Sequence, residues 1–325
     1  MLVKCALLSA LALGCIATAA DPAPAQSYPT RPITIVVPFA PGGTDAFLRS
    51  ITDRLSASLG KPVIIENRPG GAGGTVGTKA VANANPDGYT LLAGSPGPLV
   101  VASAVYKNLG YDPVKSFTPV ATLYTSPHML VVNPSLRVYS LRELVGYAKA
   151  RPAAINYASP GYGTLPHLLG EMLRLNSEID IVHVAYKGPS PAITDLLAGQ
   201  VQIYFEYLAN LRPHIESGNM RAIANADKTR SPHLPDVPTT IESGFPQIQS
   251  RYWNGILAPA GTPSDIVSRL NAVFNEALKS REIEEVFAKL GADANISSPQ
   301  EFADFIAAET RKWAAVADAA GIRAN

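Results

Sequence analysis

Short apolar runs rich in β-branched residues alternate along this chain with segments of helical periodicity. This alternation is typical of an α/β fold, in which helices connect mostly parallel strands. The predicted strands are too many for one ordinary sheet. They are Ile33 to Pro38, Val63 to Glu66, Thr90 to Ala93, Val120 to Tyr124, Met129 to Val132, Ile155 to Ala158, Ile181 to Val184, Val201 to Phe205, Arg221 to Ala224 and Tyr252 to Leu257.

Apolar residues that recur every three or four positions predict the buried faces of helices. One face comprises Phe47, Leu48, Ile51, Leu55 and Leu59, and another comprises Leu165, Leu168, Leu169, Met172 and Leu173.

Three helix starts are marked by local signals. Ser140 followed by Glu143, and Ser298 followed by Glu301, have the spacing of a capping box, in which the two side chains satisfy backbone N–H groups. The sequence TPSD at residues 262–265 is expected to open a third helix, because proline suits the first turn.

A chain of 325 residues with 47% hydrophobic content suits two domains with packed cores. No long linker separates two halves, so the chain is expected to cross between lobes near residues 123–128 and 224–228. The first lobe is then discontinuous and comprises residues 26–126 and 227–325. The second lobe comprises residues 127–226.

The first residues differ from the rest. Lys4 supplies a positive charge, residues 5–17 are almost wholly apolar, and residues 17–19 offer small side chains for cleavage, which predicts a signal peptide over residues 1–25. Cleavage after residue 19 or 20 leaves 26 Lys and Arg (27 − 1) against 26 Asp and Glu. A mature net charge near zero does not suit a nucleic-acid partner.

Both cysteines, Cys5 and Cys15, lie inside this leader, so the mature protein is expected to contain no disulfide and no cysteine metal site. Cys15 is either an apolar residue of the leader or a lipid attachment site. The lipid anchor is disfavoured because Ala12 stands where that processing signal usually has leucine. No later run approaches the roughly 20 apolar residues of a membrane span. We therefore expect an exported, soluble protein.

Common catalytic and cofactor motifs are missing. In the glycine cluster of residues 68–78, Val76 stands where G-x-G-x-x-G needs its third glycine, and no phosphate-binding G-x-x-x-x-G-K-[ST] is present. No serine sits in G-x-S-x-G, and the five histidines stand singly without metal-ligand spacing. The sequence therefore predicts no catalytic residue, no cofactor and no metal.

Two Pro/Gly elbows carry the functional signal: VVPFAPGGTDAF at residues 36–47 and NYASPGYGTLPHLL at residues 156–169. In each, a predicted strand turns directly into a helix, which exposes the unpaired N–H groups of the first helical turn. Such a helix end attracts anions, and glycine lets the ligand approach the backbone. Either elbow alone could be a simple turn. Together they predict a cleft that closes on one carboxylate.

Several ordered motifs resemble one family over essentially the whole mature chain. They include YPTRPITIVVPFAPGGTDAFLR, PVIIENRPGGAGG, ANPDGYTLL, YDPVKSFTPVA, VVNPSL, YASPGYGTLPHLLGEML, VAYKGPSPAITDLLAGQV and APAGTPSDIVSRLN. They closely resemble the substrate-binding proteins of tripartite tricarboxylate transporters, the Bug or TctC-type family. The resemblance implies a type II periplasmic binding protein: two α/β lobes with mostly parallel sheets and a ligand cleft between them. It also implies a non-enzymatic, monomeric receptor that delivers a small organic carboxylate to an inner-membrane permease.

The elbows and the resemblance together give the candidate ligand-binding residues. They are Phe39, Ala40, Pro41, Gly42, Gly43, Thr44, Asp45, Ser95, Ser159, Pro160, Gly161, Tyr162, Gly163, Thr164, His167, Lys187 and Glu206.

The chain departs from the family pattern at its second elbow. Relatives usually carry a small residue, Asn and Ser where this chain has Pro160, Tyr162 and Leu165, so a short polar side chain is lost and an aromatic one gained. Tyr162 either stacks on a ligand ring or caps the cleft. These substitutions favour an aromatic or otherwise bulky acid. Glu206 follows a strand and either receives a ligand hydroxyl, ammonium or bridging water, or forms a surface salt bridge.

Other candidates have an ordinary structural role as their alternative. Ser95 faces the cleft or belongs to a turn, and Lys187 pairs with a distal carboxylate or is simply solvated. His167 binds a loop or ligand, or packs. His183, in a predicted strand, is expected to be a satisfied core residue.

Two other functions stay open from the sequence. The closed protein could be presented to a sensor-kinase ectodomain instead of a permease. An exported hydrolase could use Ser159 or Ser95 as its nucleophile, although the sequence offers no convincing base for either serine.

Overall fold

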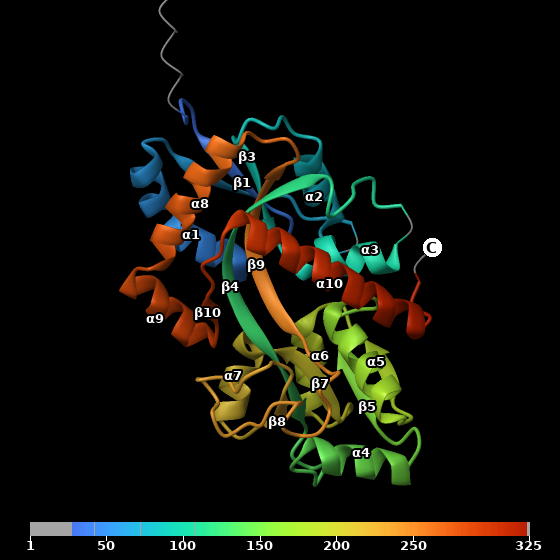
Figure 1. Cartoon of the computed structure of the whole chain (residues 1–325). Helices are drawn as coiled ribbons and strands as arrows, with labels where there is room; N and C mark the ends of the chain where they lie inside the picture. The colour runs from blue at the N-terminus through green and yellow to red at the C-terminus, as the bar shows by residue number, and fades with distance from the viewer. Residues whose placement is uncertain (1–27, 42, 72, 107, 324–325) are drawn as a thin grey trace, which may run out of the picture.

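The computed structural model describes residues 28–323 except residues 42, 72 and 107. The predicted signal peptide, Cys15 and the elbow residue Gly42 lie outside the described residues. Figure 1 shows two α/β halves, one above the other, linked by the long strands β4 (Phe117–Val132) and β9 (Arg251–Pro259).

The first half is built on a mixed sheet. Strands β2 (Val63–Asn67), β1 (Ile33–Val37) and β3 (Thr90–Gly94) are parallel neighbours in that order. Strand β9 pairs antiparallel with β3, and β4 pairs antiparallel with β9. A two-residue strand, β10 (Asp293–Ala294), also pairs with β4 and is too short for the sequence pattern to predict.

The second half has parallel neighbours β7 (Ile203–Tyr207), β5 (Asn156–Ser159) and β6 (Val182–Ala185). Strands β7 and β8 (Arg221–Asn225) pair antiparallel with the end of β4. The predicted α/β class is confirmed: parallel strands flank the antiparallel strands that connect the halves.

The prediction of separate strands at 120–124 and 129–132 was wrong, because residues 117–132 form the single strand β4. No turn interrupts it, since β4 exchanges partners without leaving the extended conformation. Up to Pro127 it pairs with β9, and from His128 it pairs with β7. Register shifts between Pro119 and Ala121 and between Thr122 and Tyr124 bend it on the way. The predicted lobe boundaries at 126/127 and 226/227 stay a prediction.

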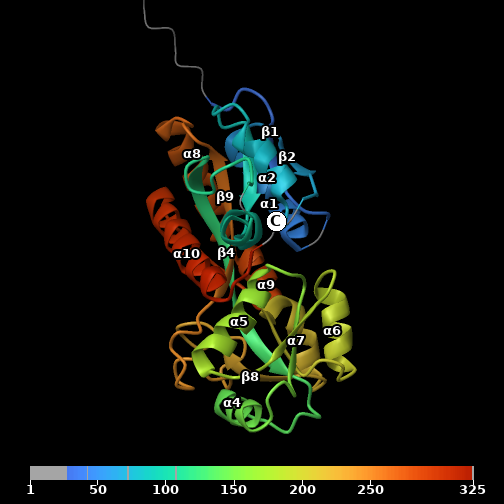
Figure 2. The ribbon, with the colours of Figure 1, turned by 90° about the vertical axis from the view of Figure 1, so that its right-hand side faces the viewer.

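Helices cover both halves, as Figures 1 and 2 show. Those of the first half are α1 (Gly43–Leu59), α2 (Thr75–Ala82), a π-helical turn η1 (Gly97–Val101) continued by α3 (Ala102–Val105), α8 (Ser264–Leu278), α9 (Arg281–Leu290) and α10 (Pro299–Ala319). Those of the second half are α4 (Leu141–Ala150), α5 (Leu165–Ser177), α6 (Pro189–Leu197) and α7 (Leu208–Glu216).

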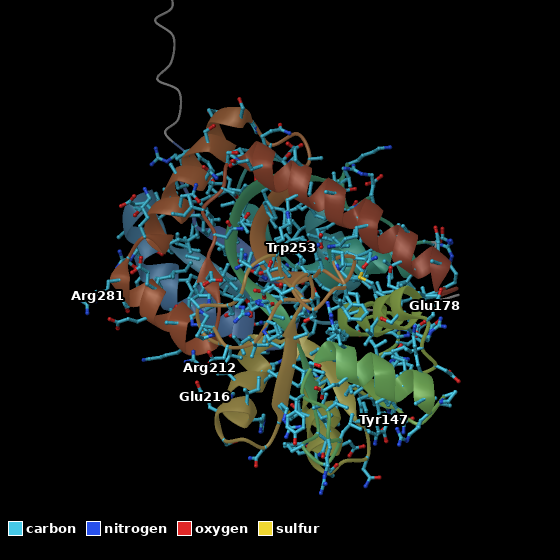
Figure 3. All side chains as sticks on the ribbon, turned by 60° about the horizontal axis from the view of Figure 1, so that its bottom comes forward. Tyr147, Glu178, Arg212, Glu216, Trp253 and Arg281 are labelled. Carbon is cyan, nitrogen blue, oxygen red and sulfur yellow. The ribbon has the colours of Figure 1, made fainter. Side chains whose placement is uncertain are left out.

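The predicted apolar faces form the core. Phe47, Leu48 and Leu55 of α1 are buried under the first sheet, and the predicted apolar face of α5 is buried in the second half. Trp253 of β9 is fully buried and meets Phe302 of α10 edge to face, with ring centroids 5.4 Å apart. In Figure 3 this ring lies in the interior, whereas Arg281 lies at the outline of the molecule.

The expected helix starts are present. Ser298 and Glu301 form a complete capping box at α10. At α4 the Ser140 hydroxyl accepts from the Glu143 N–H at 3.2 Å, as predicted, but the Glu143 carboxylate accepts from the N–H of Tyr139 instead of Ser140. Helix α8 begins at Ser264, within the TPSD sequence.

Candidate functional site

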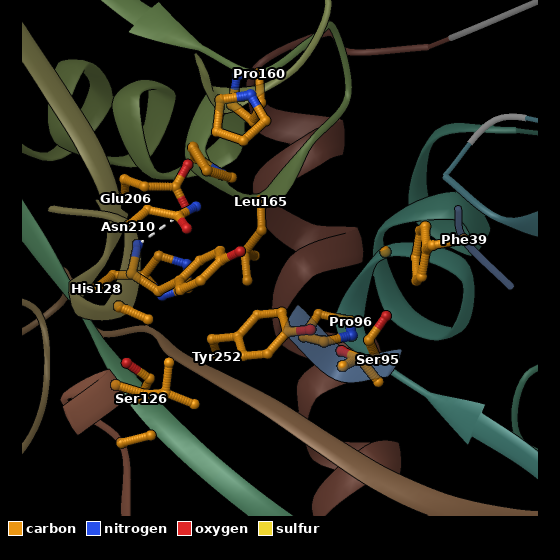
Figure 4. Close-up of a pocket in the computed structure, with 18 of the residues that line it drawn as sticks. Phe39, Ser95, Pro96, Ser126, His128, Pro160, Leu165, Glu206, Asn210 and Tyr252 are labelled. Carbon is orange, nitrogen blue, oxygen red and sulfur yellow. Dashed lines mark hydrogen bonds between the residues drawn. The ribbon is translucent and has the colours of Figure 1, made fainter. Parts of the chain in front are cut away.

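A cavity of about 450 Å³ lies between the two halves, with residues of both halves in its wall. Figure 4 shows Glu206, Asn210 and His128 on one side and Phe39, Ser95 and Pro96 facing them across the space. The lining residues are Val37, Phe39, Ala40, Thr44, Asp45, Ser95, Pro96, Gly97, Tyr124, Ser126, His128, Pro160, Leu165, Pro166, Pro189, Glu206, Tyr207, Ala209, Asn210, Tyr252, Leu290 and Ala292.

The first turns of four α-helices reach this cavity. Helices α1 and α5 contribute Thr44, Asp45, Leu165 and Pro166, and α6 and α7 contribute Pro189, Ala209 and Asn210. The Ser95-Pro96-Gly97 turn that opens η1 joins them. Pro166 and Pro189 have no N–H to donate. A helix N-terminus nevertheless carries a partial positive charge and unpaired N–H groups on its other first-turn residues, so the convergence of four of them favours an anion in the shared space.

The first elbow is held by polar contacts of residues in and next to the cavity wall. The Asn67 side chain donates to the carbonyl of Phe39 at 3.1 Å, and the Thr44 hydroxyl lies 3.3 Å from the phenol of Tyr124. Asp45, in the first turn of α1, is bound by Arg49 one turn later at 3.1 Å. Phe39, Ala40, Thr44 and Asp45 all line the cavity, whereas Pro41 does not.

At the second elbow the backbone bonds to its own loop. The N–H of Gly163 donates to His167 Nδ1 at 2.9 Å, and the N–H of Gly161 donates to Ser159 Oγ at 3.2 Å. The Thr164 hydroxyl donates to the carbonyl of Gly161 at 2.7 Å. These donors are engaged within the elbow, and none of the five residues lines the cavity. Their role as ligand contacts stays a prediction.

The second elbow also touches the first half. Gly163 has a φ of 67°, and a β-carbon at this position would lie 3.1 Å from Val105 Cγ1 in α3. Glycine is therefore favoured by the backbone conformation, and the tight contact with Val105 shows how closely the two halves approach here. Pro160 lines the cavity at this elbow, whereas Tyr162 is half exposed and packs against His167, with ring centroids 4.9 Å apart.

A pair of histidines supports the second elbow from behind. His167 and His183 are stacked with ring centroids 3.8 Å apart, and burial lowers the pKa of each to about 4. His183 Nε2 lies 2.6 Å from Ser159 Oγ. The sequence therefore missed a base beside Ser159, because a strand far along the chain supplies it. Ser159 is fully buried and does not line the cavity. His183 is hydrogen-bonded as predicted, but it is half-buried on β6 instead of lying in the core.

The floor of the cavity was not predicted. Tyr124, Ser126 and His128 alternate along β4, so their side chains fall on one face of the strand. Tyr252 of β9 stacks on Tyr207 with ring centroids 4.8 Å apart. The sequence pattern that could have indicated these residues is their spacing of two at 124, 126 and 128. The same spacing occurs in any buried strand, so it does not identify a cavity wall.

Glu206 is buried in the cavity wall at the end of β7. Its carboxylate accepts hydrogen bonds from the Tyr204 hydroxyl and, at 3.1 Å, from the N–H of Tyr207. Burial outweighs these bonds and raises the pKa of Glu206 to about 7. Ser95 is also buried and lines the cavity, whereas Lys187 is exposed and does not.

No lysine or arginine is among the cavity-lining residues that the structure describes. Burial lowers the pKa of His128 to about 3, so this imidazole is neutral. Over residues 28–323 with the three gaps, no cluster of His, Cys, Asp and Glu suits a metal ion. In the same described part, no helix has the length and apolarity needed to span a membrane.

These features define a two-lobe solute-binding protein: two α/β halves, a cavity between them, and the first turns of four helices in its wall. The model of the tripartite tricarboxylate transporter family receptor matches residues 47–322. The chain belongs to this receptor family, also represented by the Bug proteins.

Individual relatives agree with this assignment. Protein BugT of Bordetella pertussis is 41% identical over 312 residues, which cover 95% of each chain. The solved structure of R. palustris Rpa4515 with adipate is 36% identical, has a TM-score of 0.80, and matches over 91% of this chain and 100% of that one. MatC from Rhodopseudomonas palustris with bound malate is 36% identical, has a TM-score of 0.76, and matches over 89% and 99%. The type II periplasmic binding fold is thereby confirmed.

Proposed function

We propose that this protein is a monomeric periplasmic receptor that captures a small organic carboxylate between its lobes and delivers it to a tripartite tricarboxylate permease. The observation that carries the proposal is the convergence of four helix N-termini on one cavity. Hydrogen bonds from such groups to a charged ligand contribute about 1.5–3 kcal/mol each. The adipate and malate bound by two relatives belong to the same chemical class.

Capture depends on main-chain and hydroxyl donors in this proposal. Thr44, Ser95 and Tyr252 offer hydroxyl groups from the cavity wall, and the helix ends offer N–H groups. The lobes are proposed to be residues 26–126 with 227–325, and residues 127–226. Their closing motion occurs about the crossing strand β4 and the connection between β8 and β9.

Thermal unfolding in the presence of carboxylates tests the proposal. A ligand at a hundredfold excess over its Kd stabilises the folded state by about 2.7 kcal/mol, which corresponds to a rise in Tm of about 5 °C for a protein of this size. We expect this rise with some members of a panel of aliphatic and aromatic carboxylates, and none with the matching primary alcohols. The bound acid should be recovered chemically unchanged. If no carboxylate of the panel raises the Tm, the proposal is refuted.

A matched pair of variants tests the site. Thr44→Val removes a cavity hydroxyl without changing side-chain shape, and we expect carboxylate binding to weaken at least about tenfold. Thr52→Val removes a hydroxyl from the same helix that lies outside the cavity and donates to the carbonyl of Arg49, so binding should be unchanged. Equal effects of the two variants would exclude Thr44 from the site.

Closure, delivery and export have separate tests. Small-angle X-ray scattering should show a smaller radius of gyration with bound acid than without it. Deletion of the gene should abolish uptake of the acid through the permease; an unchanged uptake with a lost transcriptional response would favour the sensor-kinase role instead. The N-terminus of the protein recovered from periplasm should follow residue 19 or 20.

A further inference from the structure

Glu206 is a buried acid without a compensating positive charge. Glu206 is 1% exposed and lines the cavity, and its carboxylate accepts hydrogen bonds from the Tyr204 hydroxyl and the Tyr207 N–H. Within the described part of the chain, no cationic side chain contributes to the pKa of this carboxyl. A buried carboxylate is normally paired with a cation, so its position in a ligand cavity points to a partner that the ligand brings.

The groups around Glu206 do not supply this charge. His128 faces the cavity beside it, is neutral, and shares a hydrogen bond of 3.1 Å with the hydroxyl of Ser250. Tyr207 is neutral as well, because burial raises the pKa of its phenol. The other acid in the wall, Asp45, already has Arg49 as its partner. Glu206 is therefore the acid of the described cavity wall that lacks a counter-charge.

Asn210 adds a donor next to this acceptor. Its side-chain nitrogen is buried and has no hydrogen-bond partner among the described residues. Asn210 lines the cavity in the first turn of α7, and Figure 4 shows it next to Glu206. The Asn210 amide also acts against the effect of burial, because it lowers the pKa of the Glu206 carboxyl. The pair therefore presents a neutral donor and a negatively charged acceptor to the same part of the ligand.

We propose that the ligand is zwitterionic: in addition to the carboxylate held by the helix N-termini, it carries an ammonium group that binds Glu206. This inference rests on the proposed function and narrows its substrate class to amino acids in the broad sense, meaning molecules with a carboxylate and an amine. The stacked rings of Tyr207 and Tyr252, which also line the cavity, suit an adjacent cation. A second carboxylate at this position would instead meet a like charge in a poorly solvated space.

Calorimetric binding of matched ligand pairs tests this assignment. Each pair shares a carbon skeleton and exchanges one carboxylate for an ammonium: ω-amino acids of four to eight carbons against the linear diacids, and 4-(aminomethyl)benzoate against terephthalate. Measurements are made at pH 8, above the pKa of about 7 of Glu206, where the carboxylate is ionised. For the skeleton that fits the cavity, we expect the amino acid to bind at least about tenfold more tightly than its diacid.

Glu206→Gln keeps the size of the side chain and removes its charge. We expect this variant to bind the preferred amino acid at least about tenfold more weakly and to keep or improve its binding of the diacid. Retained diacid binding also shows that the variant is folded. The control Glu216→Gln changes a carboxylate on α7 that is 56% exposed, and it should leave both affinities unchanged.

The outcomes are distinguishable. If the diacids bind as tightly as the amino acids on every skeleton, the inference of a zwitterionic ligand is wrong, and the proposed carboxylate-binding function is unaffected. The same conclusion follows if the ω-hydroxy acids bind as tightly as the amino acids, because a neutral hydrogen-bond donor would then be enough for binding to Glu206. If no carboxylate of any kind binds, both the inference and the proposed function are wrong.

Discussion

The burial of Glu206 makes a specific prediction about the stability of the ligand-free protein. The pKa of this carboxyl is raised by burial from 4.5 to about 7 in the folded state, whereas the unfolded chain exposes it to water. Between these values the folded protein holds a proton that the unfolded protein releases. The contribution of Glu206 to the free energy of unfolding is therefore fully present below about pH 4.5 and is lost as the pH rises through 7.

The size of the effect follows from the same two values. The difference between a pKa of 4.5 and one of about 7 corresponds to about 3 kcal/mol. The side chain introduced by Glu206→Gln is never charged, so the variant does not lose this unfolding free energy as the pH rises. It gives up one of the two hydrogen bonds that the carboxylate oxygens accept, which costs about 1 kcal/mol at any pH. We therefore expect the variant to be about 1 kcal/mol less stable than the wild type at pH 4.5 and about 2 kcal/mol more stable at pH 8.

Urea unfolding of both proteins across this pH range is the assay, with fluorescence or circular dichroism as the signal. The quantity of interest is the difference in unfolding free energy between variant and wild type, because other titrating groups cancel in it. The buried neighbours Tyr204, Tyr207 and His128 are neutral throughout the range, since burial raises the pKa of each phenol and lowers that of the imidazole to about 3. A difference that stays constant with pH refutes the argument.

Two further pairs of variants test the packing and the helix ends. Gly170→Ala should destabilise the protein by about 1–3 kcal/mol in urea unfolding, because the new β-carbon would lie 2.1 Å from the ring of Tyr157. Gly146→Ala, also within a helix but with open space around it, should instead add up to about 1 kcal/mol; equal signs would contradict the packing argument. Ser298→Ala removes the hydroxyl that caps α10 and should cost about 1 kcal/mol of unfolding free energy. Ser280→Ala, at a helix start where the hydroxyl makes no capping bond, should cost little, and a similar loss there would refute the role of the cap.

Local sequence signals predicted the parts of the fold that depend on neighbouring residues. The capping box at Ser298 and the apolar face of α1 are set by contacts within one or two turns, and both are present. The same holds for the first elbow, where the strand β1 leads directly into α1 and brings Thr44 and Asp45 to the cavity. Glu206, which lies in the opposite wall of the cavity, was also among the candidate residues predicted from the sequence.

The tertiary structure decided the features that join distant segments. The continuous strand β4 depends on an exchange of partners at Pro127. Ser126 and Pro127 are residues typical of a turn, so the local sequence favours a break where the folded chain stays extended. The amide of Gly163 is engaged by His167 on the following helix, and Ser159 is held by His183, 24 residues further along the chain.

The sequence by itself determined the family, the α/β class and the helix ends from which an anion site is built, because periodicity, capping and turn chemistry act over a few residues. Only the folded chain decided which of those groups face a common cavity. That depends on the burial of Glu206, on the alternation along β4, and on the approach of the second elbow to Val105. Burial and close approach are properties of segments far apart in the chain, so they are fixed when the two halves pack and not before.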